Sequence, residues 1–313
     1  MDQQELAARE ALINLLTGGV LDRIRQRAAR GRELHPWGLH PHGPASGSLL
    51  AADNAAFEAA YPLALSGGAA LSQAALFPTM NATDNLDAAG SLVAQQTDTQ
   101  KLHASSVMQL CRSALEASAR TIWLLSDPSR EVRRDRCLSL LIGELEQQKV
   151  FLKIDGEGEA TGPNPRPPEM VTMNQEHRRK QAELVQRLKD NYSVGKPENY
   201  SKTVALAAQW VDDHIPPHDT GELANISFVS GAKTFYSLAS SLTHGYKWAV
   251  DYGRNGRLLG MIADGLAASV NMTECAVALY EAVCISHGGE SVTESYVPDR
   301  LMLTVAEWSR LYT

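Results

Sequence analysis

The chain contains few cysteines, and their spacing is not that of a disulfide-bonded or zinc-binding protein. Among its 313 residues are only Cys111, Cys137, Cys275 and Cys284, and no two of them form a C-x-x-C pair. This pattern excludes a disulfide scaffold and leaves zinc ribbons and thioredoxin-like sites without support. We therefore expect a protein whose cysteines stay reduced.

Long apolar runs are also missing. No stretch approaches the roughly 18 consecutive apolar residues that a membrane-spanning helix requires. The first five residues, MDQQE, lack the basic and apolar regions of a signal peptide. From these two absences we expect a soluble cytoplasmic protein without membrane contact.

Several common catalytic signatures are absent as well. The sequence has no G-x-x-x-x-G-K-[ST], no G-x-S-x-G and no H-E-x-x-H, and no G-x-G-x-x-G follows a strand-like segment. P-loop nucleotide hydrolases, Rossmann dehydrogenases, α/β-hydrolases and zincins are therefore poor fits. We expect no cofactor.

Excess positive charge is lacking too. Lys and Arg number 29 against 36 Asp and Glu, which gives a formal net charge of -7. This balance argues against binding to nucleic acid through bulk positive charge, although it leaves room for a local basic groove. Three basic clusters could form such a groove, or they could be solvated helix faces paired with nearby carboxylates. They are Arg23, Arg25, Arg27, Arg30 and Arg32; Arg130, Arg133, Arg134 and Arg136; and Arg178, Arg179 and Lys180.

Helical periodicity dominates what is present. Strand signals are scarce, and most apolar residues recur at spacings of three and four, which predicts an all-α fold. We expect a multi-helix bundle over residues 84–313, with a loop at 155–171. Residues 1–83 form an N-terminal helical extension that includes a His/Pro/Gly-rich loop.

The same patterns predict the individual elements. Residues 3–33 read as helix with a break at Gly18–Gly19, residues 35–47 as no regular helix, and residues 48–80 as irregular helix plus loop. A short helix is expected at 84–96. Further helices are expected at 99–125, 130–153, 172–191, 201–214, 230–250, 257–286 and 298–311, the second of these capped by Ser129.

One polar ridge lies on the helix expected at 99–125. Arg112, Glu116 and Arg120 stand at i, i+4 and i+8, so they share one helix face, and Trp123 lies beside that face. The two arginines would keep the glutamate ionised. The ridge is either a structural ladder of ion pairs or part of a functional site.

A second polar ridge lies near the C-terminus. Tyr236, Ser240 and His244 again fall at i, i+4 and i+8, next to an apolar face. Gly245 follows His244, so the imidazole could simply end the helix, where a positive group meets the negative end of the dipole. Alternatively, His244 is a group that titrates near neutral pH and can transfer protons.

Three histidines fall within eight residues of the Pro/Gly-rich loop. His35, His40 and His42 could bind zinc or nickel in principle. No cysteine or acidic ligand lies close in sequence, and the prolines make a shared geometry difficult. We therefore predict a surface or dimer-contact loop and no metal site.

The two ridges together carry a resemblance to a known family. The segments LDAA at 86–89, LCRSALEASARTIWLL at 110–125 and YSLASSLTHG at 236–245 resemble the HEPN superfamily of helical bundles, including its abortive-infection (AbiV-like) branch. The similar part covers about 84–153 and 230–287. The resemblance implies a dimer that cleaves RNA without metal, using an arginine and a histidine four to six residues apart.

Under that resemblance each ridge residue has a role. His244 moves the 2′-hydroxyl proton, Arg112 or Arg120 stabilises the phosphorane charge, and Glu116 orients them. The substrate is positioned by Tyr236, Ser240 and Trp123. Residues 237–239 contain no arginine, so the catalytic arginine would have to come from the facing helix.

Two hypotheses for function follow. The first is an RNA-directed, HEPN-like endoribonuclease of a toxin or phage-defence type, acting as a homodimer. The second is a non-catalytic helical interaction or scaffold protein, in which the two ridges form a polar network that sets helix register. Both require the helix of Arg112 to lie beside the helix of His244.

Overall fold

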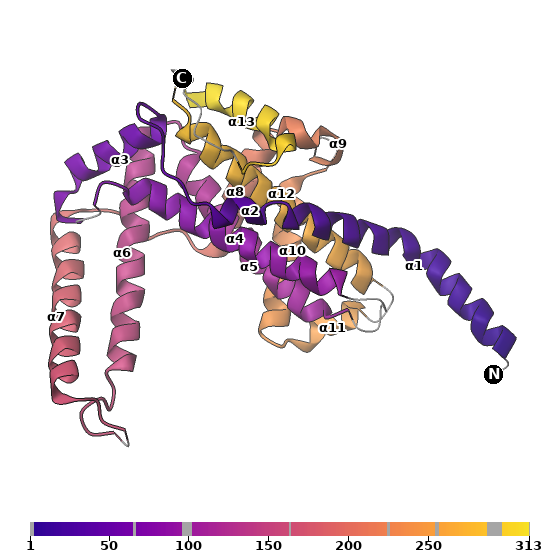
Figure 1. The fold of residues 1–313 in the computed structure, drawn as a ribbon, viewed down its shortest axis with the longest axis horizontal. Helices are drawn as coiled ribbons and strands as arrows, with labels where there is room; N and C mark the ends of the chain where they lie inside the picture. The colour runs from indigo at the N-terminus through magenta and orange to yellow at the C-terminus, as the bar shows by residue number, and fades with distance from the viewer. Residues whose placement is uncertain are drawn as a thin grey trace. The chain divides into compact units, whose positions relative to one another are not determined.

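The fold is almost entirely helical (Figure 1). The computed structural model describes residues 3–64, 67–95, 102–162, 164–223, 226–253, 257–286 and 296–312. No strand occurs in these ranges, where the β-type pairing consists of an isolated bridge between Ser48 and Ser286. The all-α prediction is confirmed. Within the same ranges, no helix has the length and apolarity needed to cross a membrane.

Most helices match the expected segments, with differences concentrated before residue 100. The α-helices are α1 (Gln3–Arg32), α2 (His35–Leu39), α3 (Leu49–Ala60), α4 (Ala70–Ala94), α5 (Ala104–Leu125), α6 (Arg130–Asp155), α7 (Pro168–Asn191), α8 (Tyr200–Asp213), α9 (Thr220–Leu223), α10 (Phe228–Thr243), α11 (Lys247–Gly253), α12 (Leu258–Cys284) and α13 (Met302–Trp308). Short 3-10 turns lie at η1 (Pro62–Ala64), η3 (Pro217–Asp219), η4 (Asp299–Leu301) and η5 (Ser309–Tyr312).

The chain forms two compact units. The larger unit comprises Met1–Leu49, Ala75–Pro128 and Asn199–Thr313, and the smaller unit comprises Leu50–Ala74 and Ser129–Glu198. This division differs from the boundary expected at residues 83 and 84, because α4 passes through that point as one continuous helix. Periodicity describes single helices, whereas units are defined by contacts between helices distant in sequence.

α12 is the centre of the larger unit. It contacts α1, α5, α10 and α13, while α8 packs on α5 and α10. Side chains on all sides of α12 are buried between Ile262 and Cys284. A helix that is buried all round is typical of an element surrounded by other helices. The juxtaposition of α5 and α10, which both functional hypotheses require, is therefore present.

Small side chains hold α5 close to α12. The Ser118 hydroxyl donates to the Thr273 hydroxyl at 2.9 Å, and the Ser269 hydroxyl donates to the Cys111 carbonyl oxygen at 2.7 Å. The apolar stripe expected from spacings of three and four along α5 is fully buried; it comprises Val107, Cys111, Ala114, Leu115, Ser118, Ile122 and Leu125. Each buried hydroxyl thus has a partner, as buried polar groups require.

The break predicted at Gly18–Gly19 is wrong, because α1 continues through both glycines. Glycine keeps its backbone N–H, so it weakens a helix by only about 1 kcal/mol per residue relative to alanine. The second half of α1 packs on α12 and buries Ile24 and Ala28. This packing stabilises the helix beyond its intrinsic propensity.

The prediction of irregular structure over residues 48–80 is also wrong. α3 and α4 occupy most of this segment, and the helix expected at 84–96 begins at Ala70. α4 contains Pro78. Near this proline, the hydroxyls of Thr79 and Thr121 both donate to the Ala75 carbonyl oxygen, at 3.1 and 2.7 Å. The helix continues through Pro78, and these hydroxyls add side-chain hydrogen bonds to the backbone next to the carbonyl of residue 74, which the proline leaves without its helical donor.

The loop expected at residues 35–47 contains one short helix, α2. Pro36 lies in its first turn, where the missing N–H would have no acceptor within the helix. Residues 40–47 are non-helical, as predicted. The prediction therefore missed a single turn.

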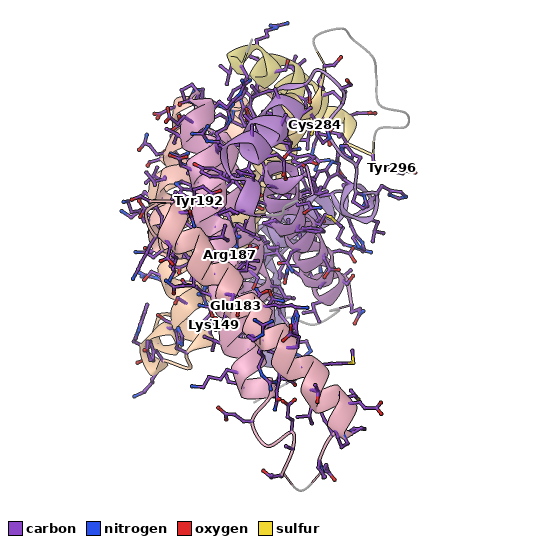
Figure 2. The ribbon with its side chains drawn as sticks, turned by 90° about the vertical axis from the view of Figure 1, so that its left-hand side faces the viewer. Lys149, Glu183, Arg187, Tyr192, Cys284 and Tyr296 are labelled. Atoms are coloured by element: carbon purple, nitrogen blue, oxygen red, sulfur yellow. The ribbon has the colours of Figure 1, made fainter. Side chains whose placement is uncertain are left out.

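α6 and α7 form an antiparallel pair in the smaller unit (Figure 1). Ser129 caps α6 as predicted, since its hydroxyl oxygen accepts from the Val132 amide at 3.4 Å. The connection between the helices spans residues 156–167, close to the loop predicted at 155–171. Figure 2 shows Glu183 and Arg187 on the outer surface of α7, where both are exposed.

A buried ion pair anchors α3 to α6 inside the smaller unit. The side chains of Asp53 and Arg133 are each 1% exposed. Arg133 donates from Nε to Oδ2 at 2.6 Å and from Nη2 to Oδ1 at 3.0 Å, and Arg130 donates to Oδ1 at 2.9 Å. A two-pronged contact of this kind is geometrically specific and strong.

Candidate functional site

The two polar ridges face each other across the α5–α10 contact. α10 begins at a defined point, because the Ser227 hydroxyl accepts from the Ser230 amide at 3.2 Å and Asp212 accepts from the Phe228 amide at 2.9 Å. The helix then presents Tyr236 toward α5. There the Arg112 guanidinium carbon lies 5.3 Å from the centroid of the Tyr236 ring, a cation–π distance.

An ion pair completes this contact. Arg112 Nη2 lies 2.8 Å from Glu116 Oε1, and each of these side chains is 18% exposed. The pKa of Tyr236 is raised by its partial burial and by the negative charge of Glu116, with Arg112 acting in the opposite direction. We call Arg112, Glu116 and Tyr236 the α5–α10 cluster.

His244 lies at the end of α10, away from this cluster. Its amide donates to the Ser240 carbonyl oxygen at 3.1 Å, and Gly245 follows with a φ of +67°, which ends the helix. The single helix expected at 230–250 is therefore interrupted here, and His244 takes the helix-ending position that was one of its two alternatives. Eight residues separate His244 from Tyr236, so the imidazole stands roughly 12 Å farther along the axis. It is exposed, with its ring 5.7 Å from the ring of Tyr246.

The remaining ridge residues take different positions. Arg120 and Ser240 are partly exposed, two turns from Arg112 and one turn from Tyr236 along their own helices. Trp123 is only 7% exposed, so its ring belongs to the core and offers little surface to a substrate. The contacts described above join Arg112, Glu116 and Tyr236 among the seven predicted site residues.

A second charged cluster, which sequence reasoning missed, surrounds Glu274 at the middle of α12. The Glu274 side chain has no exposed area. Arg30 Nε donates to its Oε1 at 2.7 Å, and Arg300 Nη2 donates to the same oxygen at 2.6 Å. His218 Nε2 lies 3.3 Å from Oε2, and Asp219 forms a 2.9 Å ion pair with Arg30. These five residues form the Glu274 cluster.

The centre of the Glu274 cluster, Glu274 and His218, is closed to solvent, and the charges of the cluster are balanced. Burial alone would raise the pKa of Glu274, but the hydrogen bonds from His218 and Arg30 and the positive charges lower it to about 2. The carboxylate is therefore a permanent anion at neutral pH. Together with the 1% exposure of the His218 side chain, this makes the cluster a structural element and not a site for substrate.

Only one sequence signal could have indicated this cluster. Glu274 is the single charged residue between Asp264 and Glu281 in a long, mainly apolar helix, and such a group needs a partner when it is buried. The partners come from α1, η3 and η4, so no local spacing identifies them.

The three loop histidines do not share a site. His35 Nδ1 lies 3.4 Å from Asp87, His40 stacks on Tyr296 with centroids 3.6 Å apart, and His42 Nε2 lies 2.9 Å from Glu281. In the described ranges, no group of three or more His, Cys, Asp or Glu side chains is placed to hold a metal ion.

The three predicted basic clusters are largely paired with carboxylates of the same unit. This arrangement matches the ion-paired interpretation of these arginines, although Arg133 is buried and not solvated. The pairs include Arg25–Asp22, Arg30–Glu274, Arg32–Asp87, Arg133–Asp53, Arg134–Glu131, Arg178–Glu159, Arg179–Glu176 and Lys180–Glu176.

Comparisons of the chain with protein families, curated proteins and solved structures find no match. The resemblance to the HEPN superfamily therefore stays a prediction. Function has to be argued from the geometry of the chain itself.

Proposed function

We propose that this chain is a non-catalytic helical interaction protein of the cytoplasm. One observation carries the proposal: the charged groups of the α5–α10 cluster bind one another. Arg112 and Glu116 form a 2.8 Å ion pair and are both largely buried, with Tyr236 against the guanidinium. A polar network of this kind between packed helices can fix their register, a role documented for buried polar groups in other helical proteins.

The charge distribution supports the same proposal. A protein that holds RNA through its phosphates needs Lys and Arg side chains that are available to displace counterions. Here the net charge is -7, and most of the clustered arginines have carboxylate partners. Their positive potential is therefore largely cancelled within each unit.

A metal-independent, HEPN-like endoribonuclease is the second candidate, and the exposed imidazole of His244 favours it. In this candidate His244 accepts the 2′-hydroxyl proton, and Arg112 or Arg120 stabilises the developing phosphorane charge. Since Arg112 lies beside Tyr236, about two helical turns of α10 from His244, the arginine that meets His244 would come from a second copy of the chain. A homodimer is part of this candidate.

RNA cleavage separates the two candidates. Purified protein and its His244→Ala variant are incubated with total RNA, and light scattering reports the oligomeric state. The interaction proposal expects no cleavage by either protein. Cleavage by the wild type that His244→Ala abolishes would establish the ribonuclease and overturn the proposal.

Thermal unfolding tests the structural role of the cluster. Arg112→Ala and Glu116→Ala each leave a largely buried charge without its partner, which should cost about 2 kcal/mol and lower the melting temperature by several degrees. Arg25→Ala is the matched control, because its pair with Asp22 is about 60% exposed and should contribute less than ~1 kcal/mol. Unchanged melting of both cluster variants would show that the ion pair does not set helix register.

A further inference from the structure

A groove in the larger unit lies between α10 and α12, away from the α5–α10 cluster. Its volume is about 480 Å³, within the range of sites that bind small organic molecules. The walls are mainly apolar and include Phe228 and Phe235 from α10 and Met261 from α12. A site of this size and composition favours a ligand with an apolar body.

Small residues on the two helices create the space. A Cβ atom added at Gly231 would meet no atom within 4 Å, so α10 is open toward the groove at this point. Ala267 and Ala268 face the groove from α12. The groove is thus built into two regular helices, which makes it a preformed feature of the unit.

The aromatic wall is held in place. Phe235 is 4% exposed, and its ring lies against Gly265, where an added Cβ would come within 2.5 Å of Cε2. The missing side chain at residue 265 therefore allows the ring to lie flat on α12. A fixed ring offers a ligand contact area at little entropic cost.

Two opposite charges border the groove on the α12 side. Arg27 reaches it from α1 and donates from Nη1 to the Ala263 carbonyl oxygen at 2.9 Å. The next residue of α12 is Asp264, whose side chain also lines the groove and is exposed. A residue with a guanidinium and a residue with a carboxylate thus both line this mainly apolar groove.

We propose that this groove binds a free α-amino acid with a large apolar side chain. The ligand's carboxylate pairs with Arg27, its ammonium group pairs with Asp264, and its side chain contacts Phe235, Leu238 and Met261. Each charge of the protein rejects one class of competitor: Asp264 repels a simple carboxylic acid, and Arg27 repels a simple amine. The zwitterion satisfies both, and this inference stands independently of the proposed function.

Calorimetric titration of the full chain tests the ligand class. The probes are L-phenylalanine, L-leucine, 3-phenylpropionate, which lacks the ammonium group, and phenethylamine, which lacks the carboxylate. We expect saturable binding of the two amino acids and binding at least about tenfold weaker for both analogues, since each loses a charge-assisted contact. N-acetyl-phenylalanine, which mimics the end of a peptide, should also bind more weakly.

Variants of residues that line the groove test where the amino acid binds. Asp264→Asn should weaken the binding of L-phenylalanine and should narrow or reverse the difference in affinity between L-phenylalanine and 3-phenylpropionate. Arg27→Gln should also weaken the binding of L-phenylalanine and should narrow or reverse the difference in affinity between L-phenylalanine and phenethylamine. Gly231→Leu fills the groove and should abolish binding. Ala267→Leu is a second filling variant if the first does not fold. Arg25→Gln, on the same helix as Arg27, is the control and should bind like the wild type.

Three results would overturn the inference. One is no saturable binding of either amino acid by the wild type at millimolar concentration. Another is equal affinity for L-phenylalanine and both analogues, which would mean that the charged rim does not recognise the ligand. The third is unchanged binding by a folded Gly231→Leu or Ala267→Leu variant, which would place the ligand elsewhere.

Discussion

Substituting Glu274 by glutamine probes the buried centre of the larger unit. The wild-type carboxylate accepts bonds from Arg30 and Arg300 and lies 3.3 Å from His218. Glutamine keeps the shape but removes the charge and replaces one acceptor oxygen by an NH₂ donor. That donor faces other donors, so at least one buried guanidinium loses a bond.

The expected loss follows from the pKa of Glu274. The folded structure lowers it from 4.5 to about 2, because the bonds from His218 and Arg30 outweigh the effect of burial. At 1.36 kcal/mol per pKa unit, this corresponds to about 3 kcal/mol of stability. A loss of that size should lower the melting temperature of the larger unit by roughly 10 °C.

The pH dependence of stability provides an independent test of the same reasoning. A carboxylate with a depressed pKa stabilises the fold fully above about pH 4.5, and the contribution is lost as the pH falls toward about 2. The difference in unfolding free energy between wild type and Glu274→Gln should therefore be constant near neutral pH. Below pH 4.5 it should shrink.

Tryptophan fluorescence during urea unfolding measures this effect in the right unit. All five tryptophans, Trp37, Trp123, Trp210, Trp248 and Trp308, belong to the larger unit. Glu33→Gln is the matched control, because Glu33 also binds Arg300 but is 59% exposed. It should change stability by less than ~1 kcal/mol.

Two outcomes would refute this reasoning. If Glu274→Gln costs no more than Glu33→Gln at neutral pH, the buried carboxylate does not stabilise the unit. If the difference between wild type and Glu274→Gln stays constant down to pH 2.5, the stabilisation does not come from the charge.

Two further substitutions test other buried charges. His42→Gln should destabilise the larger unit more at pH 6 than at pH 9, as measured by urea unfolding. The hydrogen bond to Glu281 raises the pKa of His42 against the effect of burial, so its contribution is present below pH 6.5 and is lost above the raised pKa. Asp53→Asn should cost the smaller unit about 3–5 kcal/mol, because Arg133 is left with a buried charge. Hydrogen exchange within 50–74 and 129–198 measures this, and unchanged protection there would contradict it.

The sequence by itself determined the helical class and the local features that mark helix ends. The Ser129 cap and the buried stripe of α5 both depend on residues within a few turns of one another. Such signals are contained in the spacing of side chains along one helix. The sequence also predicted that the two polar ridges would meet. Arg112 and Tyr236 do meet, whereas His244 lies at the end of α10, away from them.

The tertiary structure decided the rest. α1 continues through Gly18–Gly19, and α4 accommodates Pro78, where local propensity alone predicts interruptions. His244 stands beyond the α5–α10 cluster because tertiary packing decides which residues along α10 contact α5, and the spacing of side chains along one helix does not. The partners of Glu274 come from three distant segments, since a buried charge is matched by whatever the fold brings near it and not by its neighbours in sequence.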